Sequence, residues 1–293
     1  MLLTINQLQV KYGKQTALRI TEPLSFDAGE RIGIIGSNGA GKSTFVKALL
    51  GLVPYEGQIS TQLTPNQMAV HMQSNSYAAT MPVQYIMEAI LNTKLSKNKE
   101  AQELISFFDF KPCLSKKFNA LSGGQKQKLT IILVMLQKAE LTFYDEVTSG
   151  LDFETRQKLV EKLVEWYRDK QDTLFVVSHY YEELEQLAQK LLILDNGKVV
   201  AFGKTQDLFQ TYCGKVVYIM ENTPQNQAIT AGFPTLAAPE HLIALSCKDK
   251  ASELNMVSLF MEYNINFKRS NCDIEILYMN AKKQAAAKVS NSI

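Results

Sequence analysis

Gly36-Ser37-Asn38-Gly39-Ala40-Gly41-Lys42-Ser43-Thr44 is the stretch that decides the fold class of this chain. An apolar run precedes it at residues 32–35, and apolar residues at helical spacing follow it over 45–50. A strand, a glycine-rich loop and a helix in this order form a phosphate-binding P-loop. We expect Lys42 to reach the β- and γ-phosphates and the Ser43 hydroxyl to bind Mg²⁺. The loop alone fits kinases, GTPases and transport ATPases equally.

Composition sets the broad class of the protein. Of its 293 residues, 46% are apolar and 20% charged, which indicates one or two globular domains. The 31 basic and 29 acidic residues nearly balance, so we expect no nucleic-acid partner. Four scattered cysteines fit a reducing cytoplasm. No run approaches the ~20 apolar residues of a membrane span, so any membrane-spanning part should belong to another chain.

Strand and helix patterns alternate over residues 1–212. This alternation predicts an α/β fold with a mostly parallel sheet covered on both faces, an antiparallel β part at the N-terminus, and a helical insertion at about 74–121. The expected strands are 3–10, 18–26, 58–60, 68–72, 141–144, 173–178, and a hairpin of 191–195 with 198–202; the expected helices outside the insertion are 45–50, 123–137 and 154–168.

A small α+β extension is expected at residues 213–280. Its strands are predicted at 216–220, 242–245 and 274–279. Its helix is predicted at 250–263, with an inward stripe of Leu254, Val257 and Met261. Residues 281–293 lack apolar periodicity and are predicted to form a disordered tail.

Two further motifs resemble the ABC-type ATPases. Leu121-Ser122-Gly123-Gly124-Gln125 matches the LSGGQ signature of that family, and Asp145 with Glu146, after an apolar run, matches its Walker B element. The resemblance implies that Ser122, Gly123, Gly124 and Gln125 cap the γ-phosphate held by the P-loop of a second subunit. It also implies that Asp145 holds Mg²⁺ and that Glu146 is the general base for the attacking water. Carboxylates at the end of a strand suit such a site.

Four more residues match positions of the same family. By this resemblance Gln73 contacts Mg²⁺ and water, His179 touches the γ-phosphate, Asp152 crosses the dimer interface, and Tyr12 stacks on adenine. Each residue type alone also fits a structural role at a turn or a strand end.

The resemblance covers residues 1–212 and implies a particular working unit. Two copies bind two ATP with Mg²⁺, close and hydrolyse, and drive a separate membrane permease from the cytoplasmic face; a homodimer is favoured over a heterodimer. The sequence departs from the family at Val147, where proline is usual, and at Lys126, where arginine is frequent. Neither change removes a catalytic group, so active hydrolysis is expected.

Export of a peptide or drug-like molecule is the favoured direction. Residues 273–277 resemble the acidic-apolar strand that ends bacterial drug- and peptide-exporting ATPases. The alternatives are the ATPase of an importer, or a non-transport ABC ATPase that acts in regulation or self-protection. The surface for a permease is expected near the helical insertion, with the candidate residues Met72, Tyr77, Met81, Tyr85 and Met87, the last of which fits the core of the insertion equally well.

Overall fold

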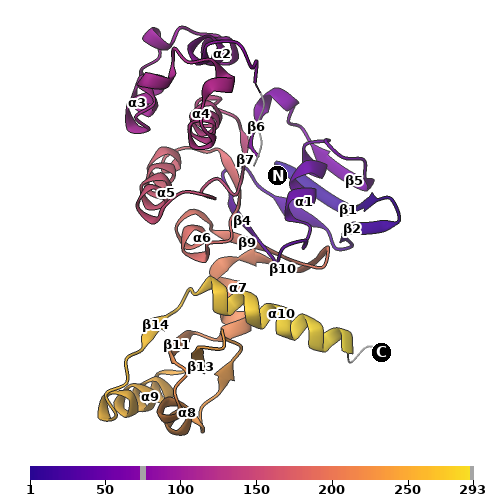
Figure 1. The fold of residues 1–293 in the computed structure, drawn as a ribbon. Helices are drawn as coiled ribbons and strands as arrows, with labels where there is room; N and C mark the ends of the chain where they lie inside the picture. Colours follow the sequence, from indigo (N-terminus) through magenta and orange to yellow (C-terminus); the bar gives the residue numbers. More distant parts are fainter. Residues whose placement is uncertain (73–76, 291–293) are drawn as a thin grey trace.

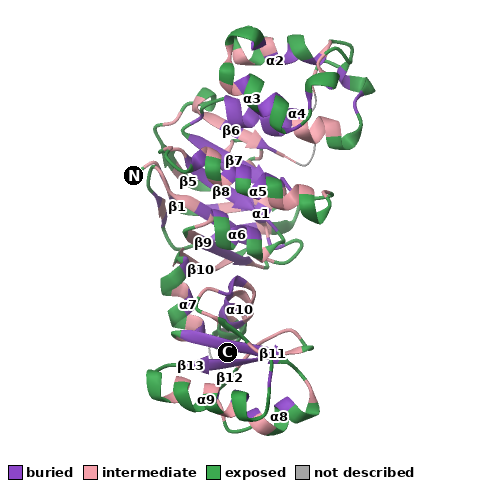
Figure 2. Ribbon diagram, turned by 90° about the vertical axis from the view of Figure 1, so that its left-hand side faces the viewer, coloured by how far each residue is buried: buried purple, intermediate pink, exposed green. Residues whose placement is uncertain are grey.

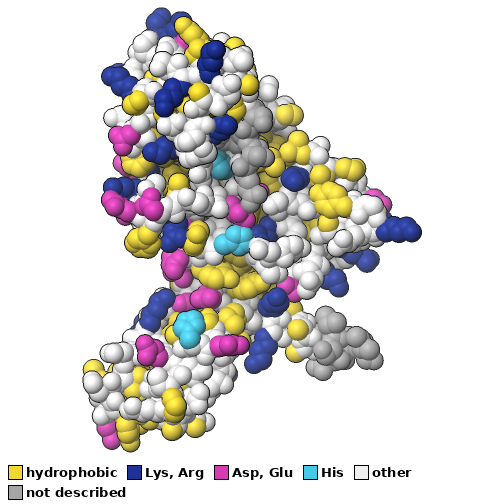
Figure 3. All heavy atoms as spheres, viewed as in Figure 1, with side chains coloured by type: hydrophobic (Ala, Val, Ile, Leu, Met, Phe, Trp, Pro, Cys, Tyr) yellow, Lys and Arg dark blue, Asp and Glu magenta, His cyan; other side chains and the backbone are white. Residues whose placement is uncertain are grey.

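The structure, a computed structural model, describes residues 1–72 and 77–290 of the chain (Figure 1). The N-terminal domain fills the upper part of Figure 1, and a smaller accessory domain lies below it. Within these residues none of the helices combines the length and the apolar character that crossing a membrane requires. Figure 3 shows basic and acidic side chains intermixed on one face of both domains.

An antiparallel sheet opens the N-terminal domain, as predicted. Its order is β2-β1-β3, and β5 also pairs with β1. The single strand predicted over 18–26 is two strands, β2 and β3, which pair one after the other with residues 8–12 and 3–5 of β1 on the edge that β5 leaves free. Pro23 lies at the break between them, because proline cannot donate a hydrogen bond to the ladder. The strands are β1 (Leu3–Tyr12), β2 (Gln15–Ile20), β3 (Leu24–Phe26) and β5 (Glu56–Thr61).

The central sheet has the order β10-β9-β4-β8-β7-β6 and is parallel except for β10, which confirms the predicted α/β class. β9 and β10 form the predicted hairpin through Asn196 and Gly197, both with positive φ. The strands are β4 (Arg31–Ile35), β6 (Met68–His71), β7 (Leu141–Asp145), β8 (Thr173–Val177), β9 (Lys190–Asp195) and β10 (Lys198–Lys204).

Helices cover both faces of this sheet, because successive side chains of each strand point to opposite sides. Phe175 and Val177 of β8 pack with the antiparallel sheet and α1, whereas Leu174 and Val176 pack in the major core with the other helices. Figure 2 shows the buried strands in purple between exposed helix surfaces. The helices are α1 (Lys42–Leu49), α4 (Gly123–Leu136), α5 (Phe153–Tyr167), α6 (Tyr181–Leu187) and α7 (Thr205–Cys213).

The segment between β6 and α4 is helical, as predicted. It contains α2 (Val83–Leu91), α3 (Lys99–Phe107) and short 3₁₀ turns. Of the five residues proposed for a permease surface, Met81 and Tyr85 are exposed, whereas Met87 is fully buried and belongs to the core.

The accessory domain has the strand–helix–strand–strand–helix–strand order of a ferredoxin-like unit. Its antiparallel sheet has the order β12-β13-β11-β14. β11 is buried on both faces: Tyr218 packs with α9, while Val217 and Ile219 belong to the major core that continues into the N-terminal domain. The elements are β11 (Val216–Glu221), α8 (Pro224–Thr230), β12 (Thr235–Leu236), β13 (Leu242–Cys247), α9 (Lys250–Glu262) and β14 (Lys268–Ser270).

The strand predicted at 274–279 is wrong, because this segment begins helix α10 (Ile274–Ser290). Asp273 starts the helix by accepting a hydrogen bond from the Ile276 amide, 3.1 Å away. Leu277 and Ala281, at helical spacing, are buried in the major core. Residues 281–290 continue this helix, so the predicted disordered tail is wrong for them. Their alanine- and lysine-rich sequence favours a helix.

The inward stripe predicted for α9 is wrong for two of its three residues, whereas Val257 is half-buried and packs against the core of the accessory domain. Leu254 is 60% exposed and Met261 is 74% exposed, whereas Met256 and Phe260 are buried. The helix carries apolar residues on two faces, and the sheet takes the face with Phe260. The ring of Phe260 packs edge-on against Tyr218, with 5.7 Å between ring centroids.

Candidate active site

The P-loop connects β4 to α1 and surrounds a cavity of about 690 Å³. Gly41 has a φ of +103°, a conformation that other residues rarely adopt, and at Gly36 an added Cβ would lie 2.4 Å from the Leu194 carbonyl oxygen. These two positions therefore require glycine. The cavity is lined by Ala17, Asn38, Gly39, Ala40, Gly41, Lys42, Ser43, Thr44, Glu146 and His179.

The side chain of Lys42 is fixed within the loop. Its Nζ donates hydrogen bonds to the carbonyl oxygens of Gly36 (2.7 Å) and Ser37 (3.2 Å). Gly36 and Ser37, although predicted to bind phosphate, thus hold Lys42 and do not line the cavity. Burial lowers the pKa of Lys42, and the negative charges of Glu146 and Asp145 oppose that shift.

Asp145 ends β7 beside the P-loop. It is buried, and its Oδ1 has no hydrogen-bond partner among the described residues. Burial raises the pKa of Asp145, while a hydrogen bond with Ser43 lowers it. An unpartnered buried carboxylate oxygen next to a hydroxyl is an oxygen-ligand arrangement that suits Mg²⁺. The residues present therefore fit the metal role that the sequence predicts for Ser43 and Asp145.

Glu146 and His179 face each other across the ends of two neighbouring strands. His179 Nε2 lies 2.7 Å from Glu146 Oε1. Glu146 has a φ of +52°, which is unusual for a residue with a side chain. Its amide donates to the carbonyl oxygen of Val177, 2.9 Å away, so this backbone conformation is held by β8. The structure thus brings the predicted general base and the histidine predicted to touch the γ-phosphate together in one cavity.

The predicted signature lies outside this cavity, at the start of α4. The Ser122 hydroxyl caps the helix by accepting from the Gln125 amide, and the Gln125 side chain accepts from the Ser122 amide. Gly123 and Gly124 are exposed, and an added Cβ at either would meet no atom within 4 Å. This helix start is open to solvent in the single chain.

Asp152, Tyr12 and Gln73 are the other residues predicted for the site. Asp152 caps α5, because its carboxylate accepts from the amide (3.0 Å) and the hydroxyl (2.7 Å) of Thr155, and the amide contact is the main reason that its pKa is lowered. Tyr12 ends β1, is 50% exposed, and does not line the cavity. Gln73 lies outside the described residues.

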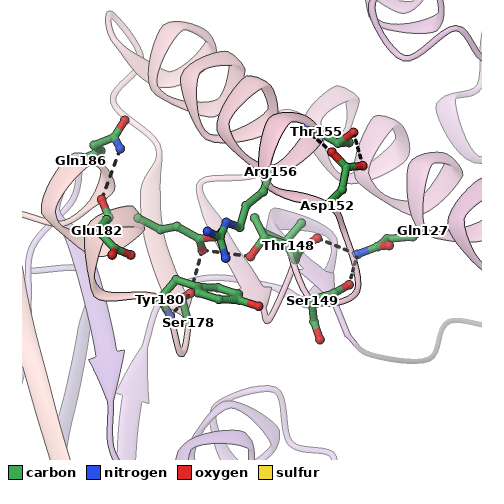
Figure 4. Close-up of polar contacts among 12 residues, drawn as sticks. Gln127, Thr148, Ser149, Asp152, Thr155, Arg156, Ser178, Tyr180, Glu182 and Gln186 are labelled. Atoms are coloured by element: carbon green, nitrogen blue, oxygen red, sulfur yellow. Dashed lines mark hydrogen bonds and ion pairs between the residues drawn. The ribbon is translucent and has the colours of Figure 1, made fainter. Parts of the chain in front are cut away.

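Sequence reasoning missed polar residues that join the elements of the site, and Figure 4 shows them. Gln127 of α4 donates to the carbonyl oxygens of Val147 (2.7 Å) and Ser149 (3.2 Å), which ties the signature helix to the segment after Glu146. Glu183 of α6 binds the hydroxyls of Thr148 and Ser178. The only sequence signal for Glu183 is its place in the first turn of the helix after His179.

Known proteins match both the sequence and the fold. The family model described as ABC transporter matches residues 23–149. The chain is 30% identical over 223 residues to the manganese transport system ATP-binding protein MntB of Halalkalibacterium halodurans, which covers 70% of this chain and 87% of that protein. The chain belongs to the ABC transporter family. As a member of the family it is an ATP-binding protein and an ATPase.

Two further likenesses extend this ABC assignment. The chain is 27% identical over 255 residues to the linearmycin resistance ATP-binding protein LnrL of Bacillus subtilis, covering 80% of each. A solved structure described as the ATP binding subunit of an ABC transporter has a TM-score of 0.64 and 26% identity, covering 72% of this chain and 93% of that one. One relative is named for resistance and another for manganese transport, so family membership leaves the direction of transport undecided.

Proposed function

We propose that this ABC ATPase hydrolyses ATP between two head-to-tail copies of the chain. The observation that carries the proposal is the separation of the two halves of the site. The P-loop, Glu146 and His179 share one cavity, whereas Ser122 and Gly123 lie exposed at another surface. In the pair, the exposed helix start of one copy supplies hydroxyl and N–H donors to the γ-phosphate held by the other copy.

In this proposal each cavity residue has a separate task. Lys42 exchanges its hydrogen bonds to loop carbonyls for the β- and γ-phosphate oxygens, and Tyr12 provides a ring for adenine. Ser43 and Asp145 hold Mg²⁺, together with Gln73 as the resemblance implies, and Mg²⁺ supplies positive charge to the phosphates. Glu146 accepts a proton from the attacking water, and ADP leaves as the γ-phosphoryl group is transferred to that water.

His179 keeps the Glu146 carboxylate in place through their 2.7 Å contact and donates to the γ-phosphate as the site closes. Asp152, whose carboxylate already fixes the start of α5, marks the segment that crosses to the second copy. These roles need two copies, and we propose a homodimer.

The partner in the membrane is a separate permease, bound at the cytoplasmic face. The helical insertion offers the exposed side chains of Met81 and Tyr85 for this contact. Export of a peptide or drug-like molecule is favoured by the match to the resistance protein, which covers 80% of this chain against 70% for the manganese protein. Residues 273–277 give no support for export, because they do not form the expected strand.

Uptake is the second candidate function. It is favoured by the higher identity to the manganese transport protein, 30% against 27%. Export and uptake can be distinguished by purifying the chain with its permease and reconstituting the complex in vesicles. ATP-driven loss of a peptide or drug from the cytoplasmic side supports export. ATP-driven accumulation of a solute on that side, dependent on a binding protein, would overturn export.

The dimer is tested with Glu146→Gln. This variant should bind ATP normally, fail to hydrolyse it, and elute as a dimer in size-exclusion chromatography with Mg-ATP. The matched control is Glu182→Gln, an exposed residue in the first turn of α6. Wild-type turnover by Glu146→Gln, or full-speed hydrolysis by a strict monomer, would refute the mechanism.

A further inference from the structure

Glu183 is a buried carboxylate that does not line the P-loop cavity. Its side chain is 4% exposed, and it projects from the first turn of α6. Two hydroxyls donate to the same oxygen, Oε2: Thr148 Oγ1 at 3.0 Å and Ser178 Oγ at 2.7 Å. Ser178 Oγ in turn accepts from the Tyr180 amide at 3.0 Å. Figure 4 shows Thr148 and Ser178 converging from separate loops.

These two loops carry the reacting groups. Thr148 lies two positions after Glu146 in the loop that follows β7, and Ser178 directly precedes His179 in the loop that follows β8. The Glu146–His179 contact joins the same two loops at 2.7 Å. Glu183 therefore closes a ring of contacts that runs from Glu146 through Thr148, Glu183 and Ser178 to His179 and back to Glu146.

The position is costly for a carboxylate. Burial is the largest influence on Glu183 and raises its pKa, while the hydrogen bonds from Ser178 and Thr148 and the charge of Arg156 oppose that shift. Arg156 forms only a long ion pair with Glu183, with 3.7 Å between Nε and Oε1. The Arg156 guanidinium instead stacks on Tyr180, 3.8 Å from the ring centroid. An apolar residue of similar size would avoid this cost, so packing alone does not account for a glutamate here.

We propose that Glu183 is a positioning residue for ATP hydrolysis, which sets the approach of Glu146 to His179 by holding Thr148 and Ser178 on one oxygen atom. The inference rests on the proposed roles of Glu146 and His179. Without the carboxylate, both hydroxyls would be buried with no shared acceptor, and the two loops would separate. A misplacement of about 1 Å can reduce a rate by about 10²-fold.

The test compares Glu183→Ala with Glu182→Ala, its neighbour on the same helix, which removes the same charge from an exposed site. We expect Glu183→Ala to lower kcat by about 10²-fold. Its KM and its affinity for a fluorescent ATP analogue should change by less than about threefold, because the P-loop is untouched. Glu182→Ala should match the wild type. Glu183→Gln keeps one acceptor oxygen, so its kcat should lie between that of Glu183→Ala and that of the wild type.

Repeating the substitution in a chain that already lacks His179 distinguishes loss of positioning from a general disruption of the structure. In a His179→Ala chain, adding Glu183→Ala should cause little further loss of the residual kcat, since both changes disrupt the same pair. An equal fold-loss in both backgrounds would overturn the inference. So would a folded Glu183→Ala chain with kcat within about twofold of the wild type, or one in which only KM rises.

A second set of variants tests the inference in case Glu183→Ala fails to fold. If Glu183→Ala does not fold, the double variant Thr148→Val with Ser178→Ala removes both hydroxyl donors instead. It should lower kcat and leave KM unchanged. An unchanged kcat in this double variant would overturn the inference. Failure of the positioning role of Glu183 can be distinguished from failure of the proposed hydrolysis mechanism. Loss of turnover in Glu146→Gln and His179→Ala without an effect at Glu183 refutes only the positioning role, whereas wild-type turnover in those two variants refutes the mechanism itself.

Discussion

His179 Nε2 and Glu146 Oε1 lie 2.7 Å apart, although the two residues come from loops after different strands of the central sheet. The parallel neighbours β7 and β8 end side by side, and this places both side chains over the P-loop. The first prediction follows from this pair. His179→Ala should lower kcat by about 10²-fold or more while leaving ATP affinity nearly unchanged. His241→Ala, exposed in the accessory domain, is the control; a loss of ATP binding in His179→Ala would contradict a role in hydrolysis alone.

The second prediction concerns the metal. Ser43→Ala removes the hydroxyl that is hydrogen-bonded to Asp145, and should raise the Mg²⁺ concentration needed for half-maximal hydrolysis by about 10-fold or more. The measurement is a Mg²⁺ titration of ATPase activity at saturating ATP. ATP affinity in EDTA should remain as in the wild type, because the loop amides and Lys42 are intact. An unchanged Mg²⁺ requirement would exclude Ser43 as a ligand.

The third prediction uses the open space at the start of α4. An added Cβ at Gly123 meets nothing within 4 Å, so Gly123→Phe should fold with a Tm close to that of the wild type. It should nevertheless block ATP-driven dimerisation and hydrolysis, because the ring would occupy the space needed by a second chain. Ser122→Ala removes the signature hydroxyl without adding bulk, and mixing this inactive variant with inactive Lys42→Ala should restore activity, since one composite site of the mixed dimer is intact. Absence of any recovery would argue against a site shared between chains.

The fourth prediction tests the packing of α10. Leu277 is fully buried, so Leu277→Ala should reduce the free energy of unfolding by about 2–5 kcal/mol. Leu254→Ala, at a position 60% exposed on α9, should change it by less than about 0.5 kcal/mol. Denaturant unfolding followed by circular dichroism measures both variants. Equal effects would mean that α10 does not pack as described.

The fifth prediction concerns pH. Burial lowers the pKa of His71 from 6.5 to about 4, and the residue is 3% exposed in β6. Because the unfolded chain binds this proton more readily, the stabilising contribution is complete above pH 6.5 and is lost as the pH falls through about 4. The loss amounts to about 3 kcal/mol. His71→Gln should show a smaller decrease in unfolding free energy between pH 6.5 and 4 than the wild type; parallel curves would contradict the buried neutral state.

Local sequence was sufficient for the parts of the site that are continuous in the chain. The glycines and Lys42 of the P-loop, the strand that delivers Asp145 and Glu146, and the Ser122 cap each depend on a few neighbouring residues. The bounds of their elements were therefore predicted to within three residues. The family resemblance implied that Glu146 and His179 both serve the γ-phosphate, but their direct contact was not predicted.

The errors arose where a short pattern had two interpretations. Residues 273–277 alternate acidic and apolar side chains, which resembles a strand, but the helix that contains them runs to Ser290 and buries Leu277 and Ala281 together. In α9 two apolar stripes have helical spacing, and only the tertiary fold selects Met256 and Phe260. Glu183 was missed because its partners lie 35 and 5 positions away and meet only through the register of β7 and β8.

The major core passes from the N-terminal domain into β11 without interruption, through Phe209 of α7 and Leu277 of α10 to Val217 and Ile219. Amide protons in β11 should therefore exchange with solvent mainly through openings that also loosen the ATPase domain. Nucleotide bound at the P-loop should slow that exchange, so the accessory sheet can report occupancy of a site that it does not touch.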